Sequence, residues 1–320
     1  MDIHVVGAGS LGMLFAAKLS PLARLHLFTR TDEQAQMIQR LGIEWFDREN
    51  RGIFRMRCDA LDKTQAAEAD AVEADWLFLM VKQKDISVSL MEGMKRITGT
   101  KTKLLCFQNG IGHAERLAEY FEPDQIYVSV TTEAARKTSP RIVEHTGKGI
   151  TWIGKDRIPI NETESAETLI NLLNNAGFKA ALSNNTNSIV WNKLLVNAVI
   201  NPLTAILRVK NGELLSSPHY LSIMKQLLDE GRSVAETQGI ELDGQLWERL
   251  LEVCLLTAEN SSSMLQDLVN GRETEVDWIN GSIIRLAHDN GINVPTHETV
   301  YHLVKGQEKS VSESGMIERP

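Results

Sequence analysis

A lysine and two asparagines at helical spacing form the most informative pattern in the sequence. Lys193, Asn197 and Asn201 stand four residues apart in an otherwise apolar segment, so on a helix they line one face. Buried polar side chains need hydrogen-bonding partners. The two amides suit a small, oxygen-rich molecule, and desolvation would lower the lysine pKa toward the range of a general acid. The alternative is a polar stripe that faces solvent.

A glycine-rich loop near the N-terminus has the spacing of a dinucleotide site. The motif GxGxxG follows an apolar strand at residues 3–6 and precedes a helical pattern at 11–19. Small residues there permit a tight turn, a close approach of the backbone to pyrophosphate and close packing of helix on strand. The motif alone is weak evidence, but this position favours a nucleotide site over a loop without function. Its residues are Gly7, Ala8, Gly9, Ser10, Leu11 and Gly12.

The end of the second strand indicates which dinucleotide binds. Folds that bind NAD usually place an acidic residue there to hold the ribose hydroxyls. This sequence has Thr29, Arg30 and Thr31 instead. A guanidinium cannot accept a hydrogen bond from a hydroxyl, but it pairs well with a 2′-phosphate. The sequence therefore predicts NADPH. The alternative is that Arg30 is solvated and Asp32 binds the ribose.

Polar residues also follow later strands of the predicted sheet. Lys82 and Asn109 each come after a buried strand, and Thr131 and Thr132 end a third, shortly before Ala135. Because ligands bind beyond the carboxyl ends of such strands, we expect these positions to meet at one edge. Asn109 could equally belong to a turn, and Lys82 could be a solvated charge.

Three polar groups accompany the helical patterns of the second half. Asn211 stands at a helix start and could be an N-cap. The run at 258–267, which contains Ser261, Ser262 and Ser263, interrupts a helical pattern and faces either water or a ligand. Glu275 lies in another polar group, for which a solvated helix start is the alternative.

The alternation of strand and helix patterns predicts an α/β domain with a doubly wound, mainly parallel sheet. A helical domain follows, with a boundary near Ser183. The predicted domains are 1–183, 184–306 and a flexible tail at 307–320. The predicted strands are 3–6, 25–28, 43–46, 53–56, 76–81, 103–107 and 126–130, with a hairpin of 142–145 and 150–153, and the helices of the second half are 186–200, 220–237, 244–268 and 276–290.

Composition limits the classes of function. The formal net charge of −8 argues against binding of nucleic acid. Cys58, Cys106 and Cys254 are widely spaced, which favours structural thiols in a reducing cytosol and predicts no metal site. The longest apolar run, at 76–81, is too short to cross a membrane. The expected location is the cytoplasm, while the oligomeric state, a homodimer among the options, stays open.

The ordered set of motifs resembles the ketopantoate reductase (2-dehydropantoate 2-reductase) family. The resemblance runs from residue 7 to about residue 281, and the set is specific although each motif is weak. The motifs are GAGSLG at 7–12, QNG at 108–110, TTxAA at 131–135, KLLVNAVINPLTA at 193–205, NGEL at 211–214, the run at 258–267 and EVDWING at 275–281.

The resemblance implies a Rossmann-type domain followed by an all-α domain similar to the C-terminal domain of 6-phosphogluconate dehydrogenase. It implies that Lys193 is the general acid and that the enzyme makes (R)-pantoate for pantothenate and coenzyme A synthesis. The choice among the three serines depends on register, and Glu275 could orient Lys193 instead of touching the cofactor. The implied NADPH contacts are residues 7–12, Arg30, Lys82, Asn109, Ala135 and Glu275, and the implied substrate contacts are Asn109, Lys193, Asn197, Asn201, Asn211 and Ser263.

The resulting hypothesis is hydride transfer from NADPH to the C2 carbonyl of 2-dehydropantoate. One rival is a reductase of another branched 2-oxo acid or a β-hydroxyacid dehydrogenase. The other rival is an NADPH-sensing regulator without catalytic activity, since a fold does not guarantee activity.

Overall fold

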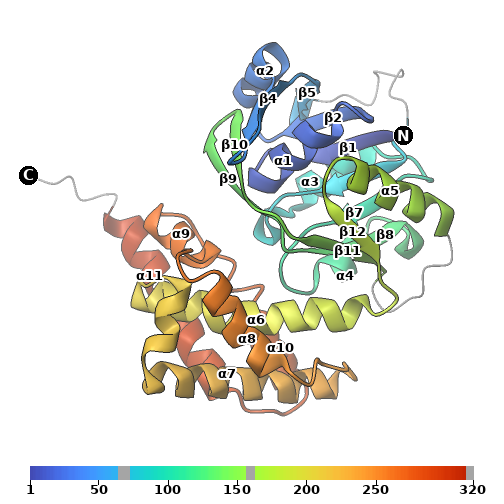
Figure 1. The fold of residues 1–320 in the computed structure, drawn as a ribbon. Coiled ribbons are helices and arrows are strands. Elements are labelled where there is room, and N and C mark those ends of the chain that lie inside the picture. The colour runs from blue at the N-terminus through green and yellow to red at the C-terminus, as the bar shows by residue number, and fades with distance from the viewer. Residues whose placement is uncertain (64–72, 156–162, 315–320) are drawn as a thin grey trace, which may run out of the picture. The chain divides into compact units, whose positions relative to one another are not determined.

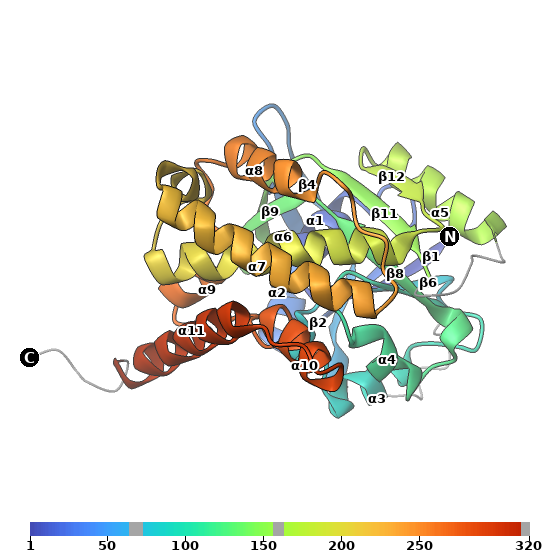
Figure 2. The ribbon, with the colours of Figure 1, turned by 90° about the horizontal axis from the view of Figure 1, so that it is seen from below.

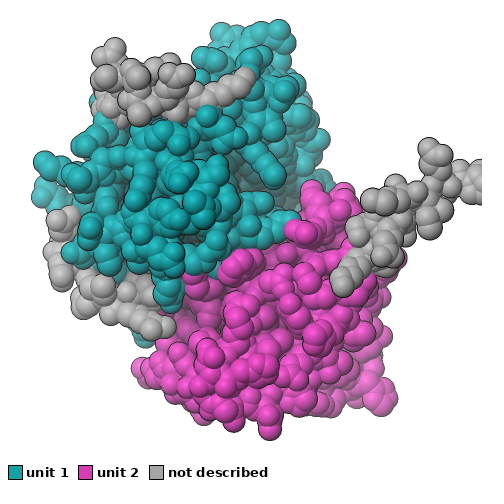
Figure 3. All heavy atoms as spheres, turned by 180° about the vertical axis from the view of Figure 1, so that it is seen from behind, with its two compact units in different colours: residues 1–108, 113–186 teal, residues 109–112, 187–320 magenta. Residues whose placement is uncertain are grey.

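The computed structural model describes residues 1–63, 73–155 and 163–314. The chain divides into two compact units, coloured separately in Figure 3. Unit 1 contains residues 1–108 and 113–186, and unit 2 contains residues 109–112 and 187–320. The predicted boundary at Ser183 lies three residues from this division.

Unit 1 is built on an eight-stranded sheet in the order β12-β11-β8-β7-β6-β1-β2-β5. All neighbouring strands are parallel except β8 and β11. The segment from β5 to β8 has the strand order of dinucleotide-binding folds, which confirms the doubly wound prediction. The bounds are β1 (Asp2–Val6), β2 (Arg24–Thr29), β5 (Arg57–Ala60), β6 (Trp76–Leu79), β7 (Lys103–Cys106), β8 (Ile126–Thr131), β11 (Ile150–Gly154) and β12 (Lys179–Leu182).

Short helices connect these strands (Figure 1). Helix α1 (Ser10–Leu19) is apolar, and seven of its ten residues are buried against the core of unit 1. The N-cap of α2 (Asp32–Leu41) is Thr31, whose Oγ1 accepts from the Gln34 N–H. The remaining helices are η1 (Leu61–Lys63), η2 (Gln83–Asp85), α3 (Val88–Arg96), α4 (His113–Ala118), η3 (Pro123–Gln125) and α5 (Thr163–Asn175).

A second, four-stranded sheet has the order β4-β3-β10-β9. Strands β3 (Ile43–Phe46) and β4 (Arg51–Phe54) form an antiparallel pair, and β4 begins two residues before the strand predicted at 53–56. The hairpin expected at 142–153 is wrong, because β10 (Ile142–Gly147) pairs with β3 and β9 (Ala134–Ser139), whereas β11 pairs with β8 and β12 in the larger sheet. Gly149 lets the chain pass between the sheets, since a Cβ there would overlap the backbone of Thr132.

Unit 2 is helical and has its own apolar core. Helices α6 (Thr186–Leu207) and α7 (Pro218–Thr237) lie side by side, as Figures 1 and 2 show, and Gly231 leaves room for Leu195 between them. By length and composition α6 could cross a membrane, but 61% of its most apolar window is buried within the protein. The other helices are η4 (Asn211–Ser216), α8 (Leu246–Leu256), α9 (Ser263–Val269), α10 (Asn280–Asp289) and α11 (Pro295–Ser314).

Two expectations for unit 2 are wrong. The single helix expected at 244–268 is interrupted between α8 and α9. There the carbonyls of Ala258 and Asn260 accept from the N–H groups of Gly212 and Asn211, and Ser262 caps α9 by accepting from the Leu265 N–H. The tail expected from residue 307 instead continues α11 to Ser314, anchored by Glu308, which accepts from both the N–H and the hydroxyl of Thr274. Residues 315–320 of that expected tail lie outside the described residues.

Candidate functional site

The glycine loop connects β1 to α1 with a backbone that requires glycine. Gly7 has φ of +112°, and a Cβ there would stand 2.8 Å from the carbonyl of Met80. A Cβ on Gly12 would overlap the carbonyl oxygen of Gly7. At Gly9, by contrast, a Cβ would meet no atom within 4 Å. The loop is therefore tightly packed on its inner side and accessible at Gly9, as a cradle for phosphates at a helix N-terminus requires.

A lysine that the sequence analysis did not single out lies at this loop. The Nζ of Lys137 donates to the Ala8 carbonyl at 3.1 Å, and its backbone N–H donates to the Ser10 hydroxyl at 3.1 Å. Burial lowers the pKa of Lys137, and no carboxylate of the described chain pairs with it. The available signal was its place two residues after Ala135, on the same face of a strand. Strand β9 was not predicted because its residues are mostly exposed and do not alternate between buried and exposed, as those of a half-buried strand do.

Arg30 and Lys82 follow the carboxyl ends of β2 and β6. The Arg30 side chain is 88% exposed and lies 3.9 Å from the Asp85 carboxylate, an ion pair of little strength. Lys82 is partly buried and precedes η2. The alternative ribose ligand, Asp32, accepts a hydrogen bond from Gln36 on its own helix at 3.0 Å. The guanidinium is thus accessible to an anion at the strand end.

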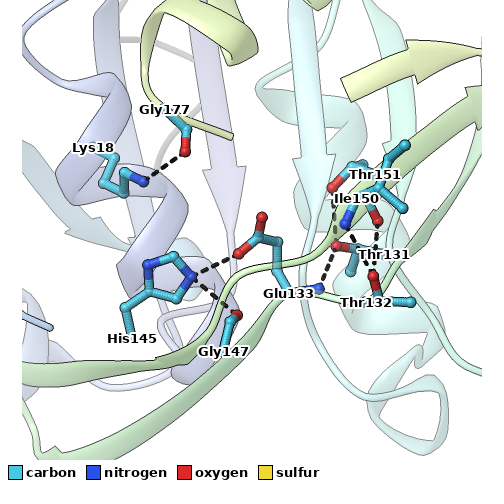
Figure 4. A network of polar contacts seen from close by, with 9 residues as sticks. All are labelled: Lys18, Thr131, Thr132, Glu133, His145, Gly147, Ile150, Thr151 and Gly177. Carbon is cyan, nitrogen blue, oxygen red and sulfur yellow. Dashed lines mark hydrogen bonds and ion pairs between the residues drawn. The ribbon is translucent and has the colours of Figure 1, made fainter. Parts of the chain in front are cut away.

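The threonines at the end of β8 form hydrogen bonds with other residues of the chain. The hydroxyls of Thr131 and Thr151 are 2.9 Å apart, and Thr132 accepts from the Ile150 N–H at 2.9 Å. Next to them, His145 Nε2 lies 2.6 Å from the Glu133 carboxylate, with both side chains 1% exposed. Figure 4 shows this network where the chain leaves β8 for β9. It therefore holds β9, with Ala135, at a fixed place beside the larger sheet.

In unit 2, α6 carries the predicted polar stripe of Lys193, Asn197 and Asn201. Asn201 is 7% exposed and Asn197 is partly buried, so the stripe does not face open solvent. No described residue hydrogen-bonds the side-chain amide of either asparagine. Two amides in a largely apolar environment are therefore left for a ligand or water.

Lys193 lies at the start of this stripe and near a carboxylate. Burial lowers its pKa from 10.5 to about 8, and the charge of Glu275 opposes that shift. Glu275 is 7% exposed and accepts from Asn109 Nδ2 at 3.3 Å. Asn109 belongs to unit 2, as part of the segment 109–112. The structure thus brings Lys193, Glu275 and Asn109 together in one unit.

The hydrogen bonds around two further predicted substrate contacts, Asn211 and the serine at 262 or 263, show which of their polar atoms are already used by the fold. Asn211 begins η4, and its Nδ2 donates to Thr257 Oγ1 at 2.9 Å while its buried Oδ1 has no partner among the described residues. The Ser262 hydroxyl caps α9 and accepts from Thr204 at 2.7 Å. Ser263 is exposed, and no described residue hydrogen-bonds its hydroxyl. The fold therefore uses Ser262, which leaves Ser263 available.

Comparison with protein families gives two matches that together span most of the chain. Residues 3–157 match the model of ketopantoate reductase PanE/ApbA, and residues 185–308 match the model of its C-terminal domain. The division between these matches falls near the division between units 1 and 2.

Individual relatives and solved structures support the same family. The 2-dehydropantoate 2-reductase of Bacillus subtilis is 34% identical over 98% of this chain and 99% of its own length, and that of Archaeoglobus fulgidus is 32% identical over 97% and 98%. A solved structure of the probable 2-dehydropantoate 2-reductase PanE from Bacillus subtilis has a TM-score of 0.80 at 32% identity, over 96% of this chain and all of its own. The ternary structure of D-mandelate dehydrogenase with NADH and anilino(oxo)acetate has a TM-score of 0.88 at 25% identity, over 98% and 100%. With both domains matched in order, the chain belongs to the ketopantoate reductase family.

Proposed function

We propose that this protein is an NADPH-dependent 2-dehydropantoate 2-reductase, which reduces the C2 ketone of 2-dehydropantoate to (R)-pantoate. This reaction is a step of pantothenate and coenzyme A synthesis. The observation that carries the proposal is the polar stripe on α6, in which Lys193 has a pKa of about 8 beside two amides with no described partner. Family membership and curated relatives of this name support it.

The residues at the carboxyl edge of the larger sheet fit a phosphorylated dinucleotide. The backbone geometry of residues 7–12 supports pyrophosphate binding at the start of α1, and Arg30 suits the 2′-phosphate. When bound, NADPH supplies the hydride for the reduction. We propose Lys137 as an additional phosphate ligand, because its ammonium contacts the glycine loop and no described carboxylate neutralises it. The proposed cofactor contacts are residues 7–12, Arg30, Lys82, Asn109, Ala135, Lys137 and Glu275.

Lys193 is the proposed proton donor. With a pKa of about 8 it is mostly protonated at neutral pH, yet it loses its proton far more readily than an ordinary lysine. Its ammonium would hydrogen-bond the ketone oxygen, stabilise the developing alkoxide and deliver the proton. The charge of Glu275 raises the pKa of Lys193 and so favours its protonated form, which supports an orienting role for this carboxylate in addition to its proposed cofactor contact.

The amides and one hydroxyl of unit 2 are proposed to hold the substrate. Asn197 and Asn201 offer both donors and acceptors, as a carboxylate and a distal hydroxyl require. Ser263 is preferred to Ser262, whose hydroxyl is used by the fold. Fixing the substrate at several points brings its ketone into attack geometry. The proposed substrate contacts are Asn109, Lys193, Asn197, Asn201, Asn211 and Ser263.

A second candidate is the reduction of a different 2-oxo acid. It is favoured by the likeness to D-mandelate dehydrogenase, whose structure contains NADH. Arg30 argues for NADPH in this chain, but it says nothing about the acid. A non-catalytic regulator is the remaining alternative, and turnover of NADPH with any 2-oxo acid would exclude it.

Asn201→Ala tests the substrate assignment. Removing the partner of a buried polar group costs about 1–3 kcal/mol, so kcat/KM for 2-dehydropantoate should fall about 5- to 150-fold. A 2-oxo acid that lacks the distal hydroxyl should be affected little. The measurement is kcat/KM for both acids in the wild type and the variant. An equal loss for both acids would show that Asn201 supports the fold or the cofactor, and would remove this support for 2-dehydropantoate.

We further propose a cytoplasmic location, in keeping with α6 as a core helix of unit 2. A homodimer stays a prediction, which light scattering of the purified chain would test.

A further inference from the structure

Helix α6 contains a proline at a position where it removes a hydrogen bond. Pro202 lies inside the helix, five residues before its last residue, Leu207. Because proline has no N–H, the carbonyl of Ala198, four residues earlier, loses its helical donor. Ala198 is fully buried, so water does not reach it to replace that donor. The helix therefore has an unsatisfied acceptor within the turn that carries Asn197 and Asn201.

Another helix supplies the missing donor. The Nδ2 of Asn280, the first residue of α10, donates to the Ala198 carbonyl oxygen at 2.9 Å. Asn280 is 0% exposed, and both Ile279 before it and Ile283 one turn later belong to the apolar core of unit 2. A side-chain amide on α10 thus replaces the backbone N–H that Pro202 lacks on α6.

A buried histidine fixes the orientation of this amide. Nε2 of His297 lies 2.9 Å from the Leu227 carbonyl, which can only accept, so Nε2 carries the proton. Nδ1 is then the acceptor for the second amide hydrogen of Asn280, at 3.0 Å. Burial lowers the pKa of His297 to about 4, which keeps the ring neutral and this arrangement intact at neutral pH. The chain of hydrogen bonds links α7, α11, α10 and α6.

We propose that Asn280, oriented by His297, is a positioning residue that replaces the hydrogen bond lost at Pro202 and thereby fixes the turn of α6 bearing Asn197 and Asn201. A proline within a helix permits a bend where the backbone bonds are missing. Asn197 precedes Ala198 in the helix and Asn201 follows it. A bend at the Ala198 carbonyl would therefore change the distance between the two side-chain amides and their relative direction. The catalytic part of this inference rests on the proposed function, since Asn197 and Asn201 bind substrate only under it.

The structural part is tested by a double-mutant cycle with Asn280→Ala and Pro202→Ala. Alanine at 202 restores a backbone N–H for the Ala198 carbonyl, so losing the Asn280 amide should matter less in that background. We expect Asn280→Ala to lower the urea midpoint of unfolding substantially in the wild type and clearly less in Pro202→Ala. Equal losses in the two backgrounds would overturn the proposal. If Asn280→Ala alone is insoluble, a soluble double variant supports the coupling and an insoluble one contradicts it.

The catalytic part needs a measurement that a purely structural role would not change. For folded Asn280→Ala we expect kcat/KM for 2-dehydropantoate to fall about tenfold or more, as for misplaced binding groups, with NADPH affinity within about twofold of the wild type. Adding Pro202→Ala should recover most of the loss. The control is Asn290→Ala, at the exposed C-terminal end of the same helix, which should leave kcat/KM unchanged.

The outcomes separate this inference from the proposed function. A lower unfolding midpoint with unchanged kcat/KM would show that Asn280 supports stability alone and would overturn the positioning role. If the wild type reduces a different 2-oxo acid, the same comparison is made with that acid. If it reduces none, the proposed function and the catalytic part fail together, whereas the unfolding cycle still decides the coupling of Pro202 to Asn280.

Discussion

At the scale of single residues, the pKa of Lys193 connects structure to rate. Burial places it at about 8, below the ordinary 10.5, so the ammonium that is the proposed proton donor disappears as pH rises through about 8. We expect kcat of the wild type to fall over that range. Lys193→Ala should lower kcat by about 10²–10⁴ and abolish this pH dependence.

Lys225→Ala is the matched control, because Lys225 is an exposed lysine of unit 2 that pairs with Asp229. It should retain the wild-type kcat and pH profile. A Lys193→Ala enzyme with near-normal kcat would show that another group donates the proton.

Arg30 is expected to select the cofactor. Loss of a charged partner of a phosphate costs about 1.5–3 kcal/mol, so Arg30→Ala should weaken NADPH binding about 10- to 150-fold. NADH has no 2′-phosphate, and its dissociation constant should hardly change. Fluorescence titration with both cofactors measures this difference, and an equal loss for both would assign Arg30 another role.

Lys137 and Arg136 are adjacent on β9 but have different partners. Arg136 donates to Glu144 through Nε at 3.0 Å and Nη2 at 2.6 Å, whereas Lys137 contacts the glycine loop. Removing Lys137 should weaken NADPH binding by about 1.5–3 kcal/mol at low salt, and by less at high salt. Removing Arg136 changes the net charge equally and should have little effect. If both alanine variants bind NADPH alike, the role of Lys137 is a general charge effect.

At the scale of elements, a substitution in the turn from β1 to α1 should weaken cofactor binding without affecting folding. A Cβ at Gly9 meets no atom within 4 Å, and its φ of −79° suits alanine, so Gly9→Ala should fold normally. The methyl group would occupy the side from which phosphates approach, and NADPH affinity should fall by at least about tenfold. Thermal unfolding and cofactor titration test the two halves of this prediction.

Gly244→Ala is the control, since a Cβ there also meets no atom within 4 Å, but in unit 2. It should change neither stability nor NADPH affinity substantially. Normal NADPH binding by Gly9→Ala would contradict the assignment of this loop to the pyrophosphate.

At the scale of the whole molecule, each of the three apolar clusters formed by the described residues lies within one unit. Separate cores predict two calorimetric transitions. The proposed phosphate contacts of NADPH all lie in unit 1, so NADPH at about 100 times its dissociation constant should add about 2.7 kcal/mol mainly to the unfolding free energy of that unit. NADPH should therefore shift mainly one transition in the wild type, and should shift it much less in Gly9→Ala. A single transition would show that the units unfold together.

Local patterns were sufficient to predict the strands from β1 to β8 that bury continuous apolar runs, and the helical spacing of Lys193, Asn197 and Asn201. The glycine motif between β1 and α1 was readable because its spacing reflects local backbone requirements. The sequence by itself thus determined the fold class, the glycine-rich loop between β1 and α1 and the polar face of α6. These features depend on residues close together in the chain.

Only the tertiary structure decided which distant segments pair. The strands expected as a hairpin at 142–153 join different sheets, because β10 pairs with β3 and β9 whereas β11 pairs with β8 and β12. The hydrogen bond from Thr204 to Ser262 and the replacement of the Pro202 hydrogen bond by Asn280 are contacts across 58 and 82 residues. Lys137 reaches Ala8 across 129 residues. Periodicity reports which face of an element is buried, but it carries no information about the partner that covers that face.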